Sequence, residues 1–210
     1  MKYFNIPAIV MLLMSTICQA QERKIEEKSI SKHYVSSLES NLILSKAEQW
    51  FTSMENSEQF EIISLNQNNG ELLIEGSTKV LYKNIGKELY PKRSGMAEVL
   101  EAAFGNKIKI QTDKEGYMIT FEVTDMKNEM YKMEDLFFNC VNFKAIEEED
   151  LKPYNKAMNK LLKANFVFKK RRDIFAENSR GQFEEVSSYL LNDGELNLFS
   201  IHEAIESEGD

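Results

Sequence analysis

The stretch that decides the fold is residues 71–82, ELLIEGSTKVLY. Leu72, Ile74 and Val80 share one face of an extended chain, and the positions between them are mostly polar. This period of two is the pattern of an antiparallel strand that is covered on one side and meets water on the other. The sequence therefore predicts a sheet with one apolar face.

Two turn signals extend this sheet. Residues 68–70, Asn-Asn-Gly, predict a hairpin with a strand over 60–65, because asparagine and glycine adopt positive φ at little cost. Residues 113–116, Asp-Lys-Glu-Gly, predict a second hairpin that joins strands over 107–111 and 117–124. The alternation also specifies the register, since a slip by one residue would expose the apolar face.

Two further segments of the sheet region are less regular. Residues 137–143 are almost continuously apolar and predict a short last strand. Residues 84–106 form an insertion between the hairpins, in which Ser94 begins and Gly105 ends a predicted short helix. The insertion is either a lid or contact surface, or an ordinary crossover that packs on the sheet.

Helices are expected before and after the strands. Ser45 and Glu48 have the spacing of a capping box, which predicts a helix over 45–56. Apolar residues recur at helical spacing over 150–167, after an acidic run that suits a helix N-terminus, and again over 181–191. The fold class is therefore α+β: an antiparallel β-meander with one face covered by N- and C-terminal helices, plus a helical C-terminal extension.

The first twenty residues have the composition of an export signal. Lys2 precedes an apolar run over 6–17, and Ala20 is a small residue at a suitable cleavage position. An uncleaved membrane anchor is the alternative, but the run falls short of the roughly 20 apolar residues of a spanning helix. A lipid anchor at Cys18 would need a small residue before it, and Ile17 is large. We expect an exported chain, periplasmic or secreted, with no transmembrane segment after cleavage.

These patterns divide the chain into four parts. We expect a signal peptide over 1–20, a flexible leader over 21–37, an α+β domain over 38–167 that contains the insertion, and a helical extension over 168–210.

Charge restricts the possible partners. The formal net charge is −8, whereas nucleic-acid binding needs a cationic surface that releases counterions, so we expect no nucleic-acid partner. The same overall balance disfavours anionic lipid surfaces. Residues 169–172, Lys-Lys-Arg-Arg, are the one dense basic cluster. They indicate either a local contact with an anion or lipid head group, or a solvated basic end of the helix over 150–167.

No catalytic constellation stands out in the sequence. His33 and His202 lie near opposite ends and are expected to be solvated, and no nucleophile elbow, phosphate loop or dinucleotide fingerprint occurs. The acidic run 147–150 lacks the alternating ligands and turn glycine of a calcium loop. Cys140 stands alone after cleavage and is expected to be a buried small residue. We expect no cofactor and no metal.

The order helix, hairpin, hairpin, helix resembles a family of exported bacterial proteins of unknown function that has a TATA-box-binding-protein-like fold. The residues that carry the resemblance are 44–50 (LSKAEQW), 70–76 (GELLIEG) and 108–123, within roughly 40–165. The resemblance implies a TBP-like fold and an exported location, and it brings no catalytic residues. Because function does not follow from fold, the name does not imply DNA binding.

We expect a non-catalytic envelope module that binds an unknown protein or small ligand through the sheet, the insertion 84–106 or a helix–sheet cleft. A carboxylate-dependent hydrolase, which would need at least two buried acids in a concave pocket, and a structural component of an envelope assembly remain as alternatives. The expected contact residues are Tyr82, Tyr90, Arg93, Met96, Tyr117, Lys169, Lys170, Arg171 and Arg172.

Overall fold

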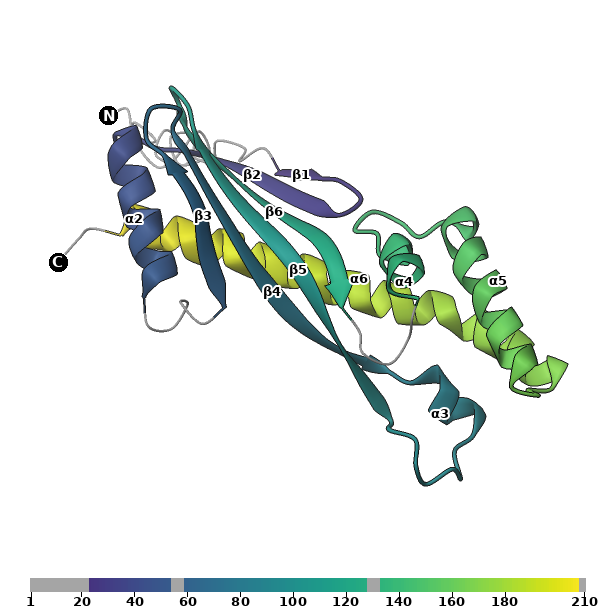
Figure 1. Cartoon of the computed structure of the whole chain (residues 1–210). Coiled ribbons are helices and arrows are strands. Elements are labelled where there is room, and N and C mark those ends of the chain that lie inside the picture. Colours follow the sequence, from purple (N-terminus) through teal and green to yellow (C-terminus); the bar gives the residue numbers. More distant parts are fainter. Residues whose placement is uncertain (1–22, 54–58, 128–132, 208–210) are drawn as a thin grey trace, which may run out of the picture.

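The computed structural model describes residues 23–53, 59–127 and 133–207. Within these residues, six strands form one antiparallel sheet in the order β1-β2-β6-β5-β4-β3 (Figure 1). The strands are β1 (Arg23–Ile25), β2 (Ser29–Val35), β3 (Phe60–Asn66), β4 (Glu71–Lys83), β5 (Val99–Thr112) and β6 (Gly116–Lys127). The helices are α2 (Ser40–Thr52), α3 (Ile85–Leu89), α4 (Glu134–Cys140), α5 (Glu148–Ala164) and α6 (Lys169–Glu206). The α+β class with an antiparallel sheet is confirmed.

Both predicted hairpins are present. β3 and β4 pair across the turn at Gly70, whose φ of 63° is the left-handed conformation that glycine adopts at least cost. β5 and β6 pair across the turn that precedes Gly116, where Asp113 Oδ1 accepts the amides of Glu115 and Gly116. The alternating side chains of β4 are buried on one face as expected.

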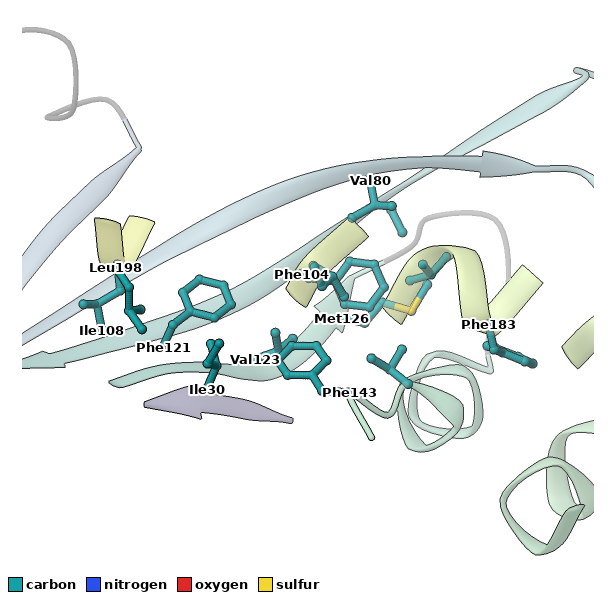
Figure 2. Packing of buried hydrophobic residues seen from close by; sticks show 14 of the residues in the cluster. Ile30, Val80, Phe104, Ile108, Phe121, Val123, Met126, Phe143, Phe183 and Leu198 are labelled. Atoms are coloured by element: carbon teal, nitrogen blue, oxygen red, sulfur yellow. The ribbon is translucent and has the colours of Figure 1, made fainter. Parts of the chain in front are cut away.

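The 38-residue helix α6 lies across the apolar face of the sheet (Figure 1). Its residues Phe183 and Leu198 are buried in the same cluster as Phe104 and Phe121 of the sheet (Figure 2). Gly194 lets helix and sheet approach closely, because a Cβ there would lie 2.6 Å from the Phe121 ring. The helix therefore supplies one layer of the core, and the sheet supplies the other.

The expectation of a flexible leader over 21–37 is wrong for its described residues. β1 and β2 form one edge of the sheet, where β2 pairs with β6 from Ser29↔Glu122 to Val35↔Gly116. Ile30 and Tyr34 are buried. Two buried apolar residues in a short polar strand give a weak periodic signal in the sequence. Pairing with β6 further stabilises β2 in the sheet.

The helix predicted between Ser94 and Gly105 is also wrong. Residues 99–106 belong to β5, so the insertion covers less of the chain than expected. Leu100, Ala102 and Phe104 are buried in alternation and continue the inward face of the strand. The same stretch carries apolar residues three and four apart, and pairing with β4 selects the extended form.

The strand predicted over 137–143 is replaced by helix α4. Glu134 and Asp135 occupy its first turn, where acidic side chains favour a helix, and β2 already occupies the free edge of β6. A short apolar run cannot by itself distinguish a buried strand from a buried helix.

The helix boundaries differ in three places. α2 begins at Ser40, so Ser45 lies inside the helix and not at its start, while residues 54–56 lie outside the described residues. The helix predicted over 181–191 is part of the much longer α6, and the basic cluster 169–172 opens α6 instead of following α5. α5 itself is confirmed, with a capping box formed by Glu147 and Asp150.

The predicted signal peptide, 1–20, lies outside the described residues. Across the described parts of the chain, no helix combines the length and the apolar character that crossing a bilayer requires.

Candidate binding cavity

A cavity of about 440 Å³ lies where the ends of β4, β5 and β6 meet α3, α4, α5 and the first turns of α6. The sheet forms one wall of the cavity. The register of the sheet pairs Tyr82 of β4 with Leu100 of β5, and both side chains are buried. Met126 of β6 continues this wall. At this end of the molecule, α3, α4 and α5 lie beside the first part of α6 (Figure 1).

The opposite wall is built from aromatic side chains on three helices. Phe137 of α4 lies 5.3 Å from the Tyr82 ring and 6.1 Å from the Tyr154 ring, measured between centroids. Tyr154 of α5 stacks at 6.5 Å on Phe175 of α6. These contacts hold the helices against one another, so the cavity wall is preorganised.

Four methionines line the cavity. They are Met96, Met126, Met133 and Met158. Methionine side chains are flexible and polarizable, so they adapt to an irregular partner at little cost. Met158 also belongs to the buried core cluster, whereas Met96 is partly exposed.

The described lining contains three tyrosines and five other polar side chains, which are Asn84, Arg93, Glu134, Asn165 and Gln182. Asn84 and Gln182 are both nearly buried, and each already donates a hydrogen bond of 2.8 Å to a backbone carbonyl, those of Ala97 and Lys83 respectively. These bonds fix the loop after β4 and tie α6 to the strand end. Glu134 is the one carboxylate among the described lining residues.

The expected contact residues lie in three places. Tyr82, Tyr90, Arg93 and Met96 line the cavity. The basic cluster stands beside it: the Arg171 guanidinium lies over the Tyr90 ring, 4.3 Å from its centroid. Arg172 donates from Nη1 to the carbonyl of Val167, a lining residue, at 2.6 Å, and Lys169 and Lys170 are exposed. Tyr117 lies elsewhere, in the core below α6.

The residues that sequence reasoning missed here are chiefly Phe137, Phe175 and the short helix α3. Phe137 was assigned to a strand, and α3 is too short to show a helical period. The i, i+4 pair Tyr154 and Met158 was recognised as a helix face, but nothing in its spacing separates a cavity wall from a filled core.

Tyr117 belongs to a polar cluster at the other end of α6. Its hydroxyl lies 2.7 Å from Nδ1 of His202 and 3.2 Å from Oε1 of Glu206, and the His202 ring stacks on Tyr34 at 4.0 Å. His202 is therefore half-buried and bonded, which corrects the expectation that it is solvated. His33 is more open and lies 2.9 Å from the Asp113 carboxylate.

The electrostatics of this cluster oppose a nucleophilic role for its two tyrosines. Burial raises the pKa of Tyr34 to about 12 and raises the pKa of Tyr117 further. Burial also lowers the pKa of His202, with Glu206 acting in the opposite direction. Two phenols that hold their protons and a neutral imidazole form a structural hydrogen-bond network, since a nucleophilic tyrosine needs a lowered pKa.

Two other polar groups, Asp193 and Cys140, bear on the alternatives. The pKa of Asp193 is raised by burial, but its carboxylate accepts a hydrogen bond of 2.7 Å from Thr78 and lies outside the cavity lining. Burial raises the pKa of Cys140 to about 12, and its thiol contacts the carbonyl of Leu136 at 3.2 Å, so the expectation of a buried small residue is confirmed. No group of three or more metal-ligating side chains occurs in the described ranges.

No family model matches the chain, and no curated protein matches it. Solved structures do match this chain. One is a DUF4468 family protein from Bacteroides ovatus, with a TM-score of 0.38 and 13% identity, over 56% of this chain and 67% of that one. Another is a TBP-like protein from Parabacteroides distasonis, with a TM-score of 0.40 and 12% identity, over 86% of this chain and 92% of that one. These neighbours include a TBP-like protein, and the sequence resemblance was to a family with a TBP-like fold.

Proposed function

We propose that this protein is a non-catalytic exported module of the cell envelope that binds one small, mainly apolar ligand. The observation that carries the proposal is the cavity of about 440 Å³ between the strand ends and α3 to α6. Ligand sites usually have volumes of about 300–1,000 Å³ and mostly apolar walls with a few polar groups, and this cavity has that character.

The lining selects the chemistry of the ligand. Aromatic and methionine side chains favour contact with apolar ligand surface. The side-chain amides of Asn84 and Gln182 each already donate a hydrogen bond to a backbone carbonyl. A ligand that buries about 200 Å² of apolar surface gains about 5 kcal/mol, before the cost of immobilising it. A flexible aliphatic or small aromatic molecule with at most one or two polar atoms fits best.

A hydrolase that works through two carboxylates has no support in the described residues. The described lining contains one carboxylate, Glu134, while Asp193 is held by Thr78 outside the cavity. Both features favour binding over the hydrolytic alternative, which needs two acids that face one substrate.

The test is a titration with the uncharged fluorophore N-phenylnaphthylamine. Met96 lines the cavity and is only partly exposed, so Met96→Trp places an indole where the ligand would lie. Met118→Trp is the matched control, because Met118 is 39% exposed on β6 and does not line the cavity. We expect wild type and control to bind alike, and Met96→Trp to bind about tenfold more weakly or worse. Equal binding by all three proteins, or no binding by any, would exclude the cavity as the site.

Export is tested separately from binding. If the proposal is right, expression in a Gram-negative host will yield a mature chain that begins at Gln21 and fractionates with the envelope or medium. A full-length chain in the cytosol would remove the envelope part of the proposal and leave the cavity part standing.

A structural role in an assembly is the second candidate. Tyr189, Leu196 and Phe199 lie on the outer side of α6, and 50%, 65% and 56% of their surfaces are exposed. Their spacing places them on one stripe of the helix. Self-association in sedimentation experiments that Leu196→Glu abolishes would favour this role.

A further inference from the structure

One corner of this acidic chain carries a dense group of cations. Residues 151–172 contain eight cations and no acid, although the whole chain has a formal net charge of −8. They belong to α5, to the first turn of α6 and to the turn that joins the two helices. The eight are Lys152, Lys156, Lys160, Lys163, Lys169, Lys170, Arg171 and Arg172.

The fold turns these cations outward. The four lysines of α5 are spaced four, four and three residues apart, so they form a single stripe, and all four are exposed. The opposite side of α5 is buried through Leu151, Tyr154 and Met158. Within the described residues, one of the eight cations, Lys152, forms an ion pair, with Glu149. Arg171 stacks on Tyr90 and Arg172 donates to the Val167 carbonyl, whereas five exposed lysines form no ion pair in the described chain and can meet an external partner: Lys156, Lys160, Lys163, Lys169 and Lys170.

The position of residues 169–172 is unfavourable for the helix that they begin. The N-terminus of a helix carries the positive end of its dipole, so four cations in the first turn destabilise α6. The sequence predicted these cations at the C-terminus of the helix over 150–167, where they would stabilise that helix. Helix stability therefore does not explain the cluster.

Two exposed aromatic side chains stand between the two sets of cations. Phe166 is 92% exposed and Phe168 is 78% exposed, whereas Val167 between them is buried and lines the cavity. The backbone of Phe166 is left-handed, with a φ of 59°, which is rare for a bulky residue. The turn therefore keeps a strained backbone conformation at Phe166, and both phenyl rings lie in water. Strained backbone conformations recur at functional sites.

We propose that this corner, the basic tip of residues 160–172, docks on the surface of an anionic lipid bilayer. The cations contact lipid head groups, and Phe166 and Phe168 enter the interface just below them. A bilayer satisfies both features, because it presents negative charge next to an apolar layer. A soluble polyanion would satisfy only the charges. The overall acidity, which disfavours lipid surfaces on average, orients the molecule with this tip towards the membrane.

The rest of the fold agrees with that orientation. α6 runs about 57 Å from the tip, so its other end and α2 lie far from the surface (Figure 1). The cavity lies at the tip end, since Leu161, Leu162 and Val167 line it. The docking inference does not depend on ligand binding, because the tip residues and the cavity walls can be changed separately.

The test is sedimentation with vesicles of pure phosphatidylcholine or of phosphatidylcholine with phosphatidylglycerol. We expect partitioning onto the anionic vesicles only, weakening as salt rises. Replacing Lys163, Lys169 and Lys170 by Gln should reduce partitioning at least tenfold. The matched control replaces three cations with no ion pair in the described chain that lie off the tip, Lys114, Lys127 and Lys144, by Gln, and should change it less than twofold.

Separate variants test the contribution of the aromatic side chains to vesicle binding. Phe166→Gly relieves the left-handed strain, so it should leave the melting temperature unchanged or higher while it weakens vesicle binding severalfold. Phe199→Ser removes an aromatic that is 56% exposed elsewhere on α6 and should have no effect. Equal binding to neutral and anionic vesicles would overturn the proposal. So would binding to heparin or single-stranded DNA that is as tight as to vesicles and unaffected by Phe166→Gly.

Discussion

Gly194 provides a sharp test of how closely α6 lies on the sheet. A Cβ at this position would lie 2.6 Å from Cδ1 of Phe121, a ring that is fully buried and has no free space in which to move. At Gly181, in the same helix, an added Cβ meets nothing within 4 Å. Both substitutions to alanine gain about 1 kcal/mol of helix propensity, so that gain cancels in their difference.

The remaining difference is the cost of overpacking. Forcing a methyl group into a filled core costs about 1–3 kcal/mol. Gly181→Ala should therefore stabilise the protein by about 1 kcal/mol, and Gly194→Ala should be less stable than Gly181→Ala by about 1–3 kcal/mol. Urea unfolding followed by circular dichroism measures both, with the slope m checked for constancy. Equal stabilisation by the two variants would mean that helix and sheet do not approach as described.

Three further predictions concern charge and protonation. Lys46 donates to the carbonyls of Ile205 and Ser207 at the C-terminus of α6, so Lys46→Met should lower the free energy of unfolding by about 1–2 kcal/mol in urea melts. Because burial lowers the folded-state pKa of His202, stability should be full above its ordinary value of 6.5 and fall as the pH drops below it, and His202→Gln should flatten that pH dependence of the urea midpoint. The raised pKa of Asp193 has the opposite effect: the free energy of unfolding falls as the pH rises above 3.8 and through the folded-state pKa of this carboxyl. Asp193→Asn should therefore be at least as stable as wild type in thermal melts at pH 7.

The hairpins could be predicted because their signals are local. Asn-Asn-Gly at 68–70 and Asp-Lys-Glu-Gly at 113–116 specify turns by their own backbone preferences, and the alternating strands next to them specify the register. α5 was equally predictable, since its acidic start and its buried stripe depend only on residues within the helix.

The candidate site could be predicted only in part. Tyr82, Tyr90, Arg93 and Met96 were expected to make contacts and do line one cavity, but its existence depends on Phe137 and Phe175, which approach from distant parts of the chain. No spacing within the sequence encodes an empty volume between elements. The basic tip was visible as a run of cations, whereas the exposure of its phenylalanines was not.

The sequence by itself determined the elements whose preferences are local: two hairpins, an amphipathic strand, the helix α5 with its acidic start, and an acidic chain with one basic segment. Tertiary structure decided the rest. Leu100, Ala102 and Phe104 suit a strand, and Leu100, Ala103 and Phe104 suit a helix, so only pairing with β4 chose between them. β2 took the free edge of β6 by backbone hydrogen bonding, and residues 137–140 of the predicted strand became part of helix α4. Where local preferences are nearly balanced, the free energy of long-range pairing and burial sets the outcome.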